Sequence, residues 1–386
     1  MSVTRKKLLT WLAFLFLTHG IAYFFSPEHV HDPSSPYKYL KYVIVLIYIF
    51  FTIQHNFYSK LIFFAALIPL AVYYNLINAD PDMINFVGYV LPAYFLFDIK
   101  NIRQINWRAI VVWTILITSI VGYYEVIFLD NHFYMYNRSF QDYRMVSIFL
   151  NPNNLGVVIT LFTFAYLEFF STKKIVSWLC YFNGLLIVVL SGSKTAIGVF
   201  MFFSLYILYL AVANRHGENA LIKRTDLKYL IFGIPVFLVV AVRLISMIDL
   251  SQMRDFNWGS LMVRFRDYDD FFLLVRQNYL FPYINSTKNI DNMYLHLWGS
   301  FGLSTLVLFT LFNLFLVVKI KSRKMLIILL SFFLIGLTTN YMYLWPLGYL
   351  YWGFLSFCFT PHHSVSIERL VLDQVSLHKG STGRNS

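Results

Sequence analysis

The chain has 386 residues, of which 58% are hydrophobic, 20% aromatic and only 13% charged, and its mean hydropathy is +0.61. Soluble domains carry about 25% charged residues, so this composition, with apolar runs of roughly 18 residues recurring along the chain, excludes a soluble globular fold. The net charge of +12 does not by itself indicate nucleic acid, because lysines and arginines also gather in the cytoplasmic loops of membrane proteins. Cys180 and Cys358 both fall in apolar runs and predict neither a disulfide framework nor a metal site.

Twelve membrane-spanning helices are predicted. The first follows the basic start MSVTRKK and runs to about residue 25; no small-residue cleavage site follows, so we expect a retained helix rather than a signal peptide. The second span is short, and only a polar patch around Asn340 and Tyr341 separates the last two, so ten or eleven spans remain alternatives. The other predicted spans are 39–54, 59–77, 82–98, 107–129, 147–170, 175–192, 195–213, 228–248, 292–318, 325–341 and 345–360.

The distribution of lysine and arginine predicts the side of the membrane that each loop faces. With both termini in the cytoplasm, 20 of the 31 basic residues lie in cytoplasmic segments and only five in short outer loops, as the positive-inside rule requires. The predicted organisation is nine spans over 1–248, an outer loop over 249–291, three spans over 292–360 and a cytoplasmic tail over 361–386. The predicted fold class is an all-α polytopic membrane protein with about twelve transmembrane helices and one long extracytoplasmic loop.

The outer loop is the longest polar interruption in the chain. Its middle has apolar residues at a helical repeat and charged residues between them, which predicts an amphipathic helix in the plane of the membrane interface. A solvated connector is the alternative. Arg243, Arg264 and Arg266 belong to this outer side, where they can pair with loop aspartates or bind an anionic headgroup such as a diphosphate. The apolar positions are Leu261, Phe265, Tyr268, Phe272, Val275 and Tyr279.

A polar stretch, YRMVSIFLNPNNLG over 143–156, leads from an outer loop into the sixth predicted span. Pro152 suits the first position of a helix, and Asn151 and Asn153 can cap that helix or donate to a ligand. Arg144 precedes them by a few residues. Glu125, near the outer end of the fifth span, is an intramembrane carboxylate and is also a candidate functional residue.

A second stretch, SGSKTA over 191–196, breaks two apolar runs at the same predicted outer level. A tight turn between helices accounts for Ser191, Gly192 and Ser193. It does not account for Lys194, a charge held beside the hydrocarbon region.

The third stretch, IDNMYLHLWGSFGLSTLVLF over 290–309, opens the tenth predicted span. On a helix, Asn292, His296 and Gly299 share one face and Gly302 lies on the adjoining one. Close helix packing accounts for the two glycines.

Taken in order, these stretches resemble the O-antigen polymerase and ligase superfamily of bacterial envelope glycan assembly. The family pattern has an Arg before an Asn-Pro-Asn, a Ser-Gly-Ser-Arg-like turn, an Arg in a long outer loop, and a His-Asn or Asp-Asn pair that opens a Gly-bearing helix. Those places are filled by Arg144, Asn151-Pro152-Asn153, Ser191-Gly192-Ser193-Lys194, Arg264 and Asp291-Asn292. The likeness in topology and loop position covers nearly the whole chain. Lys194 replaces the usual arginine, and Asp291 replaces the histidine of the ligases, which favours a polymerase.

The resemblance implies a GT-C-like glycosyltransferase at the outer face of the bacterial cytoplasmic (inner) membrane. Its substrates would be oligosaccharide repeat units on undecaprenyl diphosphate, which it would join into O-antigen or capsular polysaccharide. Arg144 and Arg264 would stabilise diphosphate or transition-state charge, and Asp291 would act as base on the acceptor hydroxyl. The residues expected to bind substrate are Lys194, Asn151, Asn153, Ser193, Arg266, Arg243, Asn292, His296 and Glu125.

No cofactor is expected, because a glycan donor linked to a lipid diphosphate needs no nucleotide-sugar site, and positioned cations can stabilise the leaving group without a metal. The expected partners are the lipid-linked oligosaccharide and membrane lipid, with a chain-length regulator and a flippase as candidates, and no nucleic acid. Two alternatives remain. A ligase that passes finished glycan to the lipid A core shares the fold and most motifs. A lipid-linked oligosaccharide flippase also has about twelve helices, but such transporters usually show paired repeats of hydropathy, and this chain does not.

Overall fold

A computed structural model describes residues 3–24, 37–77, 83–128, 144–171, 173–213, 259–280, 290–320, 322–342 and 344–358. Within these ranges the chain is mostly helical and has no strand, which confirms the all-helical prediction for the described residues. The elements are α1 (Val3–Thr18), α2 (Ile21–Phe24), α3 (Tyr37–Thr52), α4 (Phe57–Ile77), α5 (Met83–Val90), η2 (Leu91–Phe97), α6 (Ile99–Ile102), α7 (Trp107–Phe128), η4 (Ser147–Phe149), α8 (Pro152–Ala165), η5 (Tyr166–Phe170), α9 (Lys174–Ser191), α10 (Lys194–Ala213), α12 (Gly259–Gln277), α13 (Met293–Phe301), α14 (Leu303–Lys319), α15 (Arg323–Gly336) and α16 (Leu347–Cys358).

Four of the described helical segments are long and apolar enough to cross a membrane: α4, α7, α8 with its π-helical end η5, and α9. Shorter apolar helices include α3, α10 and α14. The boundaries of α3, α4, α7, α9 and α10 agree with the predicted spans to within a few residues, because each apolar run ends where polar residues begin. The predicted span over 228–248, the residues 249–258 of the loop and the tail over 361–386 lie outside the described residues.

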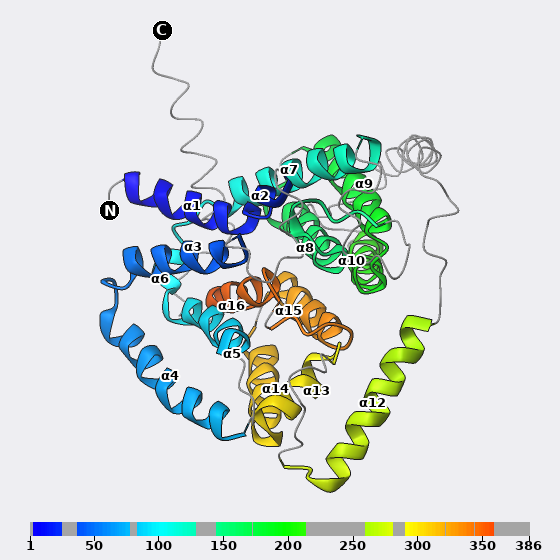
Figure 1. Cartoon of the computed structure of the whole chain (residues 1–386). Helices are drawn as coiled ribbons and strands as arrows, with labels where there is room; N and C mark the ends of the chain where they lie inside the picture. Colours follow the sequence, from blue (N-terminus) through cyan, green and yellow to red (C-terminus); the bar gives the residue numbers. More distant parts are fainter. Residues whose placement is uncertain are drawn as a thin grey trace.

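The C-terminal helices α15 and α16 lie at the centre of the arrangement, with the N-terminal helices on one side and α8 and α10 on another (Figure 1).

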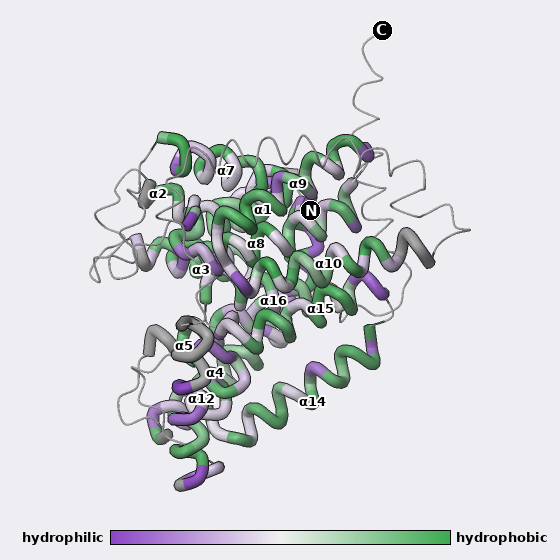
Figure 2. The backbone as a smooth tube through the Cα atoms, turned by 90° about the vertical axis from the view of Figure 1, so that its right-hand side faces the viewer, coloured by the Kyte–Doolittle hydropathy of each residue, from purple (hydrophilic) through white to green (hydrophobic). Residues whose placement is uncertain are grey.

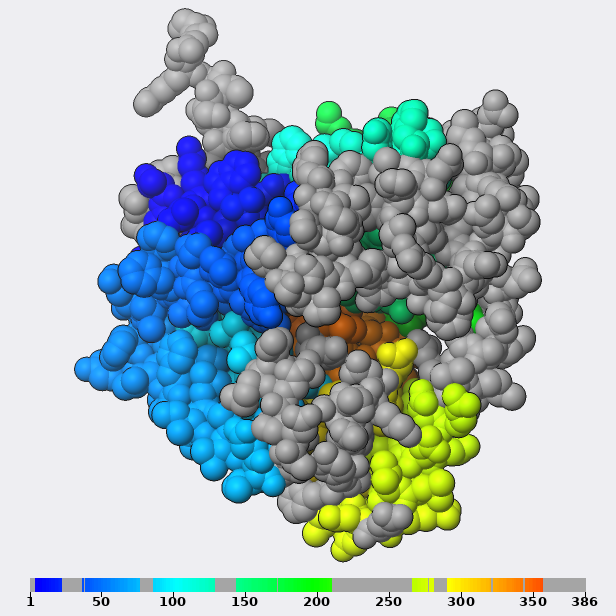
Figure 3. All heavy atoms as spheres, viewed as in Figure 1, coloured from blue at the N-terminus to red at the C-terminus, as the bar shows by residue number. Residues whose placement is uncertain are grey.

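Buried residues make up 78% of the span formed by α8 and η5 but only 17% of the span formed by α4, so α8 is a central helix and α4 a peripheral one. On the face shown in Figure 3, the blue N-terminal helices form one flank and the yellow-green α12 the other. Both α4 and α14 expose apolar residues along much of their length, as lipid-facing helices require, and α14 is largely green in Figure 2.

The two predicted spans that begin with polar stretches, 147–170 and 292–318, are each broken near their start. The span over 147–170 begins with the short turn η4, and its main helix starts only at Pro152, where Asn151 caps it. The span over 292–318 is interrupted at Gly302, whose φ of +86° ends α13 and begins α14. This glycine therefore allows a backbone conformation that other residues rarely adopt, a role that the predicted close helix packing did not include.

The predicted amphipathic helix is present as α12, and its buried side differs in part from the predicted stripe. Phe271 is 1% exposed and packs with Tyr268 and Val275 against Ile290 and Trp298. Two residues of the predicted stripe, Phe272 and Tyr279, are instead largely exposed. The helix thus has one narrow apolar side that packs against α13. A second apolar side, which includes Phe272 and Tyr279, is exposed.

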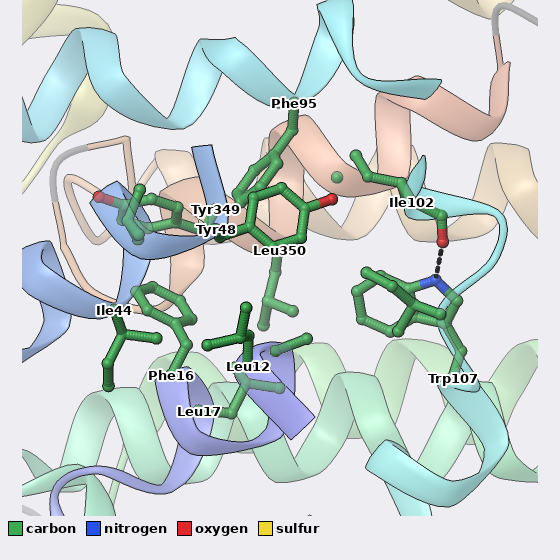
Figure 4. A pocket seen from close by; sticks show the side chains of 14 residues that line it. Leu12, Phe16, Leu17, Ile44, Tyr48, Phe95, Ile102, Trp107, Tyr349 and Leu350 are labelled. Atoms are coloured by element: carbon green, nitrogen blue, oxygen red, sulfur yellow. Dashed lines mark hydrogen bonds between the residues drawn. The ribbon is translucent and has the colours of Figure 1, made fainter. Parts of the chain in front are cut away.

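An apolar cavity of about 50 Å³ lies between α1, α3, η2, the turn after α6 and α16 (Figure 4). Trp107 closes one side, where its indole N–H donates to the carbonyl of Ile102 at 3.0 Å. None of the residues proposed from the sequence as functional lines this cavity.

Candidate functional site

The segment from Arg144 to Asn151 is not α-helical: it contains the short turn η4, and its middle is buried. Met145, Val146, Ser147, Ile148 and Phe149 are each at most 4% exposed. Ser147 and Leu150 have positive φ values of 47° and 56°, which non-glycine residues rarely adopt. Strained backbone of this kind persists only where its surroundings fix it, and it occurs preferentially at functional sites.

The guanidinium of Arg144 connects this segment to the turn after α9. Its Nε donates to the carbonyl of Ser191 at 2.8 Å, and its Nη2 donates to Oδ1 of Asn153 at 2.8 Å. Both acceptors are neutral, so these two bonds orient the guanidinium without neutralising its charge. The backbone is joined at the same point, because the Met145 N–H donates to the carbonyl of Leu190 at 2.9 Å.

The stretch over 191–196 is a tight turn between α9 and α10, as predicted. Gly192 has φ +58° and lies against Arg144, whose Nε would be 3.4 Å from an added Cβ. Ser191 and Ser193 are fully buried, and their hydroxyls accept from the N–H groups of Ser193 and Ala196 at 3.3 Å each. The geometry therefore gives these two serines local turn contacts.

The three asparagines at the start of α8 make different contacts. Asn151 is the N-cap: its Oδ1 accepts from the N–H groups of Asn153 at 2.8 Å and Asn154 at 3.3 Å. The side chain of Asn153 faces Arg144, while Asn154 donates to the carbonyl of Trp345 at 2.9 Å. The capping interpretation thus holds for Asn151, and Asn153 is bound to the candidate cation.

A segment between α15 and α16, residues 337–346, connects the three polar stretches. The carbonyl of Leu337 accepts from the Asn292 amide at 3.2 Å and from the Tyr268 hydroxyl of α12 at 3.3 Å. The hydroxyls of Thr338 and Thr195 are 2.6 Å apart, which brings this segment beside Lys194 at the start of α10. The three polar stretches therefore meet around one short segment, although this segment is 191 residues away from the first of them at the contact of Asn154 with Trp345.

The Asp-Asn pair opens α13. Asn292 is its N-cap, with Oδ1 accepting from the N–H groups of Tyr294 at 3.0 Å and Leu295 at 3.1 Å. Asp291 is exposed and precedes the cap. A capping role, which could have explained an aspartate here, thus belongs to its neighbour.

His296 lies on the same helix and joins a separate polar network. Its Nδ1 contacts the hydroxyl of Tyr89 and lies 3.1 Å from the hydroxyl of Ser300. The Asn340 amide donates to the same Tyr89 hydroxyl at 2.7 Å, which links α13, α5 and the segment 337–346.

Glu125 is 2% exposed and faces the protein interior from α7. Its carboxylate accepts from the N–H of Ser147 at 2.7 Å and from the N–H of Val146 at 3.2 and 3.3 Å. This group was predicted to bind substrate, and the structure places it on the backbone of the segment that carries Arg144.

Three of the four remaining predicted residues lie in described helices. Arg266 is on the exposed side of α12, and Arg264 is on the same helix, four residues before Tyr268. Lys194 begins α10, next to Thr195. Arg243 lies outside the described residues.

Sequence reasoning left out Thr195, Thr338 and Tyr89, and it mentioned Asn340 only as part of a polar patch. Their signal in the sequence is faint: a few polar residues at the edge of apolar runs. Their importance comes from contacts across the fold, such as the 143 residues that separate Thr195 from Thr338.

No protein-family model, characterised protein sequence or solved structure matches the chain. Within the described residues, no group of three or more His, Cys, Asp or Glu side chains is arranged to hold a metal ion.

Proposed function

We propose that the protein is a membrane glycosyltransferase that polymerises undecaprenyl-diphosphate-linked oligosaccharide repeat units at the outer face of the bacterial cytoplasmic membrane. The observation that carries the proposal is the Arg144 guanidinium, oriented by Asn153 and Ser191 where the first two polar stretches meet. Arginine suits a diphosphate because its planar fork forms two charge-assisted hydrogen bonds at once.

The proposed reaction needs two kinds of group on this side of the membrane. The hydroxyl oxygen of the acceptor sugar attacks the anomeric carbon of the donor glycan, and the bond from that carbon to the diphosphate oxygen breaks. Cations stabilise the charge that develops on the leaving lipid diphosphate, and we assign this role to Arg144, with Lys194 and Arg264. The hydroxyl proton passes to a base, and Asp291 is the assigned group.

The placement of Asp291 supports this assignment. Asn292 already caps α13, so capping does not explain the aspartate, and its exposure makes its carboxylate accessible to a substrate. The contact of Asn292 with Leu337, next to Thr338, links the pair to the turn that carries Lys194. The proposed topology has twelve spans with both termini in the cytoplasm, which puts these stretches on the outer side.

Deletion of the gene, followed by electrophoresis of the surface glycan, separates the proposed function from its alternatives. Loss of a polymerase leaves a lipid A core that bears a single repeat unit. A bare core with polymer accumulating on the lipid carrier would instead indicate a ligase, and absence of both surface forms would indicate a flippase.

Asp291→Asn tests the assigned base with purified protein and lipid-linked repeat units. Asparagine cannot take up the proton, so polymer formation should fall by about 10²–10⁴-fold while the protein remains folded. Asp269→Asn, at an exposed aspartate of α12, is the matched control and should leave the rate unchanged. Polymer formation at the wild-type rate by Asp291→Asn protein would remove Asp291 from the mechanism.

A further inference from the structure

One face of α7 is built to receive the segment that carries Arg144. Thr118, Gly122 and Glu125 follow each other at helical spacing on that face. The Thr118 carbonyl accepts from the Ser147 hydroxyl at 2.8 Å. A Cβ at Gly122 would be only 2.7 Å from Sδ of Met145, so only glycine allows this close approach without displacing the methionine.

Glu125 completes this face with a carboxyl group. Backbone N–H groups that are not paired within a helix need another acceptor when they are buried, and in a membrane protein no water supplies one. The carboxylate of Glu125 accepts from two consecutive N–H groups, those of Val146 and Ser147.

The same segment is held from its other sides. An added Cβ at Gly20 would be 1.8 Å from the carbonyl oxygen of Ile148, so the end of α1 packs directly on the backbone of η4. The ring of Phe149 packs on Trp345 with centroids 5.7 Å apart. The anchored amides are two and three residues from Arg144, and the positive φ of Ser147 lies at the point of anchorage.

We propose that Glu125 is a positioning residue: its carboxylate fixes the backbone at Val146 and Ser147 and thereby sets the position of the Arg144 guanidinium. The anchoring stands on these contacts alone. Its consequence for turnover rests on the proposed function, so the two are tested by separate measurements.

Amide hydrogen exchange, followed by mass spectrometry on the full-length protein in detergent, tests the anchoring. Glu125→Met removes both acceptor oxygens at similar length, and exchange at Val146 and Ser147 should become roughly 10- to 100-fold faster. Glu125→Gln keeps one acceptor oxygen and should give a smaller increase in the exchange rate. If the Met variant does not fold, the Gln variant decides whether Glu125 anchors the segment. Unchanged exchange in the Gln variant would overturn the proposal.

Glu168→Gln is the matched control. Glu168 is also a buried carboxylate at the end of an apolar span, but it pairs with Lys324 at 3.5 Å. Its replacement should leave exchange at Val146 and Ser147 as in the wild type. Faster exchange there in this variant as well would show a general loosening of the bundle and would count against a specific anchor.

A double-mutant cycle tests whether Glu125 acts through Arg144. Polymer formation from purified lipid-linked units should fall about tenfold or more in Glu125→Gln protein, and adding Glu125→Gln to Arg144→Ala should cause no further loss. Losses that multiply would show that Glu125 acts independently and would overturn the positioning role. If the wild-type protein forms no polymer, the proposed function fails, and the exchange experiment still decides the anchoring.

Discussion

Two cations of this protein, the buried Lys60 and the half-buried Arg144, are held by different kinds of acceptor. Lys60 is 0% exposed and lies 2.6 Å from Oδ1 of Asp98, which is 1% exposed and also accepts from Tyr48 at 2.8 Å and from Asn101. Arg144 is held by the neutral oxygens of Ser191 and Asn153. The buried ion pair of Lys60 and Asp98 ties helices together, whereas the hydrogen bonds of Arg144 to two neutral oxygens orient its guanidinium.

The two cations also join different parts of the molecule. The Lys60 ammonium contacts the carbonyl of Thr52 and lies 5.2 Å from the centre of the Tyr94 ring, so the pair joins α3, α4 and η2. The cluster around Arg144 joins η4, α8 and the turn after α9 instead. We therefore expect substitutions at the first centre to change stability and those at the second to change activity.

The largest expected effect is that of Asp98→Ala. Removing the carboxylate leaves Lys60 charged and buried, which should lower the free energy of unfolding by about 3–5 kcal/mol. Thermal unfolding of the purified protein in detergent measures this. The double variant Lys60→Met/Asp98→Leu removes both charges and should recover most of the stability; a double variant as unstable as Asp98→Ala would show that the pair is not what the single substitution disrupts.

Arg144→Ala should lower activity and leave stability almost unchanged. Removal of one group that stabilises developing charge in a transition state typically lowers turnover by about 10²–10³-fold. We expect that loss in polymer formation, with a free energy of unfolding close to wild type. Arg103→Ala, in the turn after α6, is the control and should leave turnover unchanged. Full activity of the Arg144→Ala protein would remove the main observation behind the proposed function.

Asn153→Asp would convert the second centre into one like the first. A carboxylate 2.8 Å from the guanidinium would neutralise its charge, and an acidic group in the first turn of α8 also interacts favourably with the helix dipole, by about 0.3–1 kcal/mol. Stability should therefore be equal or higher while polymer formation falls about tenfold, as expected for a weakened diphosphate interaction. Asn153→Ala, which removes the contact without adding charge, should cost less activity. Equal activity of the Asp and wild-type proteins would show that the charge of Arg144 is not used.

The sequence predicts one of these centres better than the other, for a physical reason. The helix start at Pro152 and the cap at Asn151 follow from local chemistry, so the stretch around Arg144 can be found by reading along the chain. The partner of Lys60 is 38 residues away, and charge counting places this lysine among the loop cations. Likewise, the two N–H groups that Glu125 accepts from are 21 and 22 residues distant, and no periodicity in the sequence points to them.

The smallest expected effect is that of Gly192→Ala, which tests how closely the turn after α9 controls Arg144. Gly192 has φ +58°, where an alanine costs about 1 kcal/mol, and the new Cβ would lie 3.4 Å from Nε of Arg144, which is ordinary van der Waals contact. The guanidinium therefore need not move far, and we expect a stability loss of about 1 kcal/mol with only a few-fold loss of polymer formation. Gly192→Asn should be milder, because asparagine tolerates positive φ.

Gly198→Ala is the matched control: it lies in α10 with no atom within 4 Å of the added Cβ, and it should stabilise the helix slightly. A Gly192→Ala protein as inactive as Arg144→Ala, at unchanged stability, would mean that the turn and not α8 sets the guanidinium, and would shift the anchor of the site from Asn153 to Ser191.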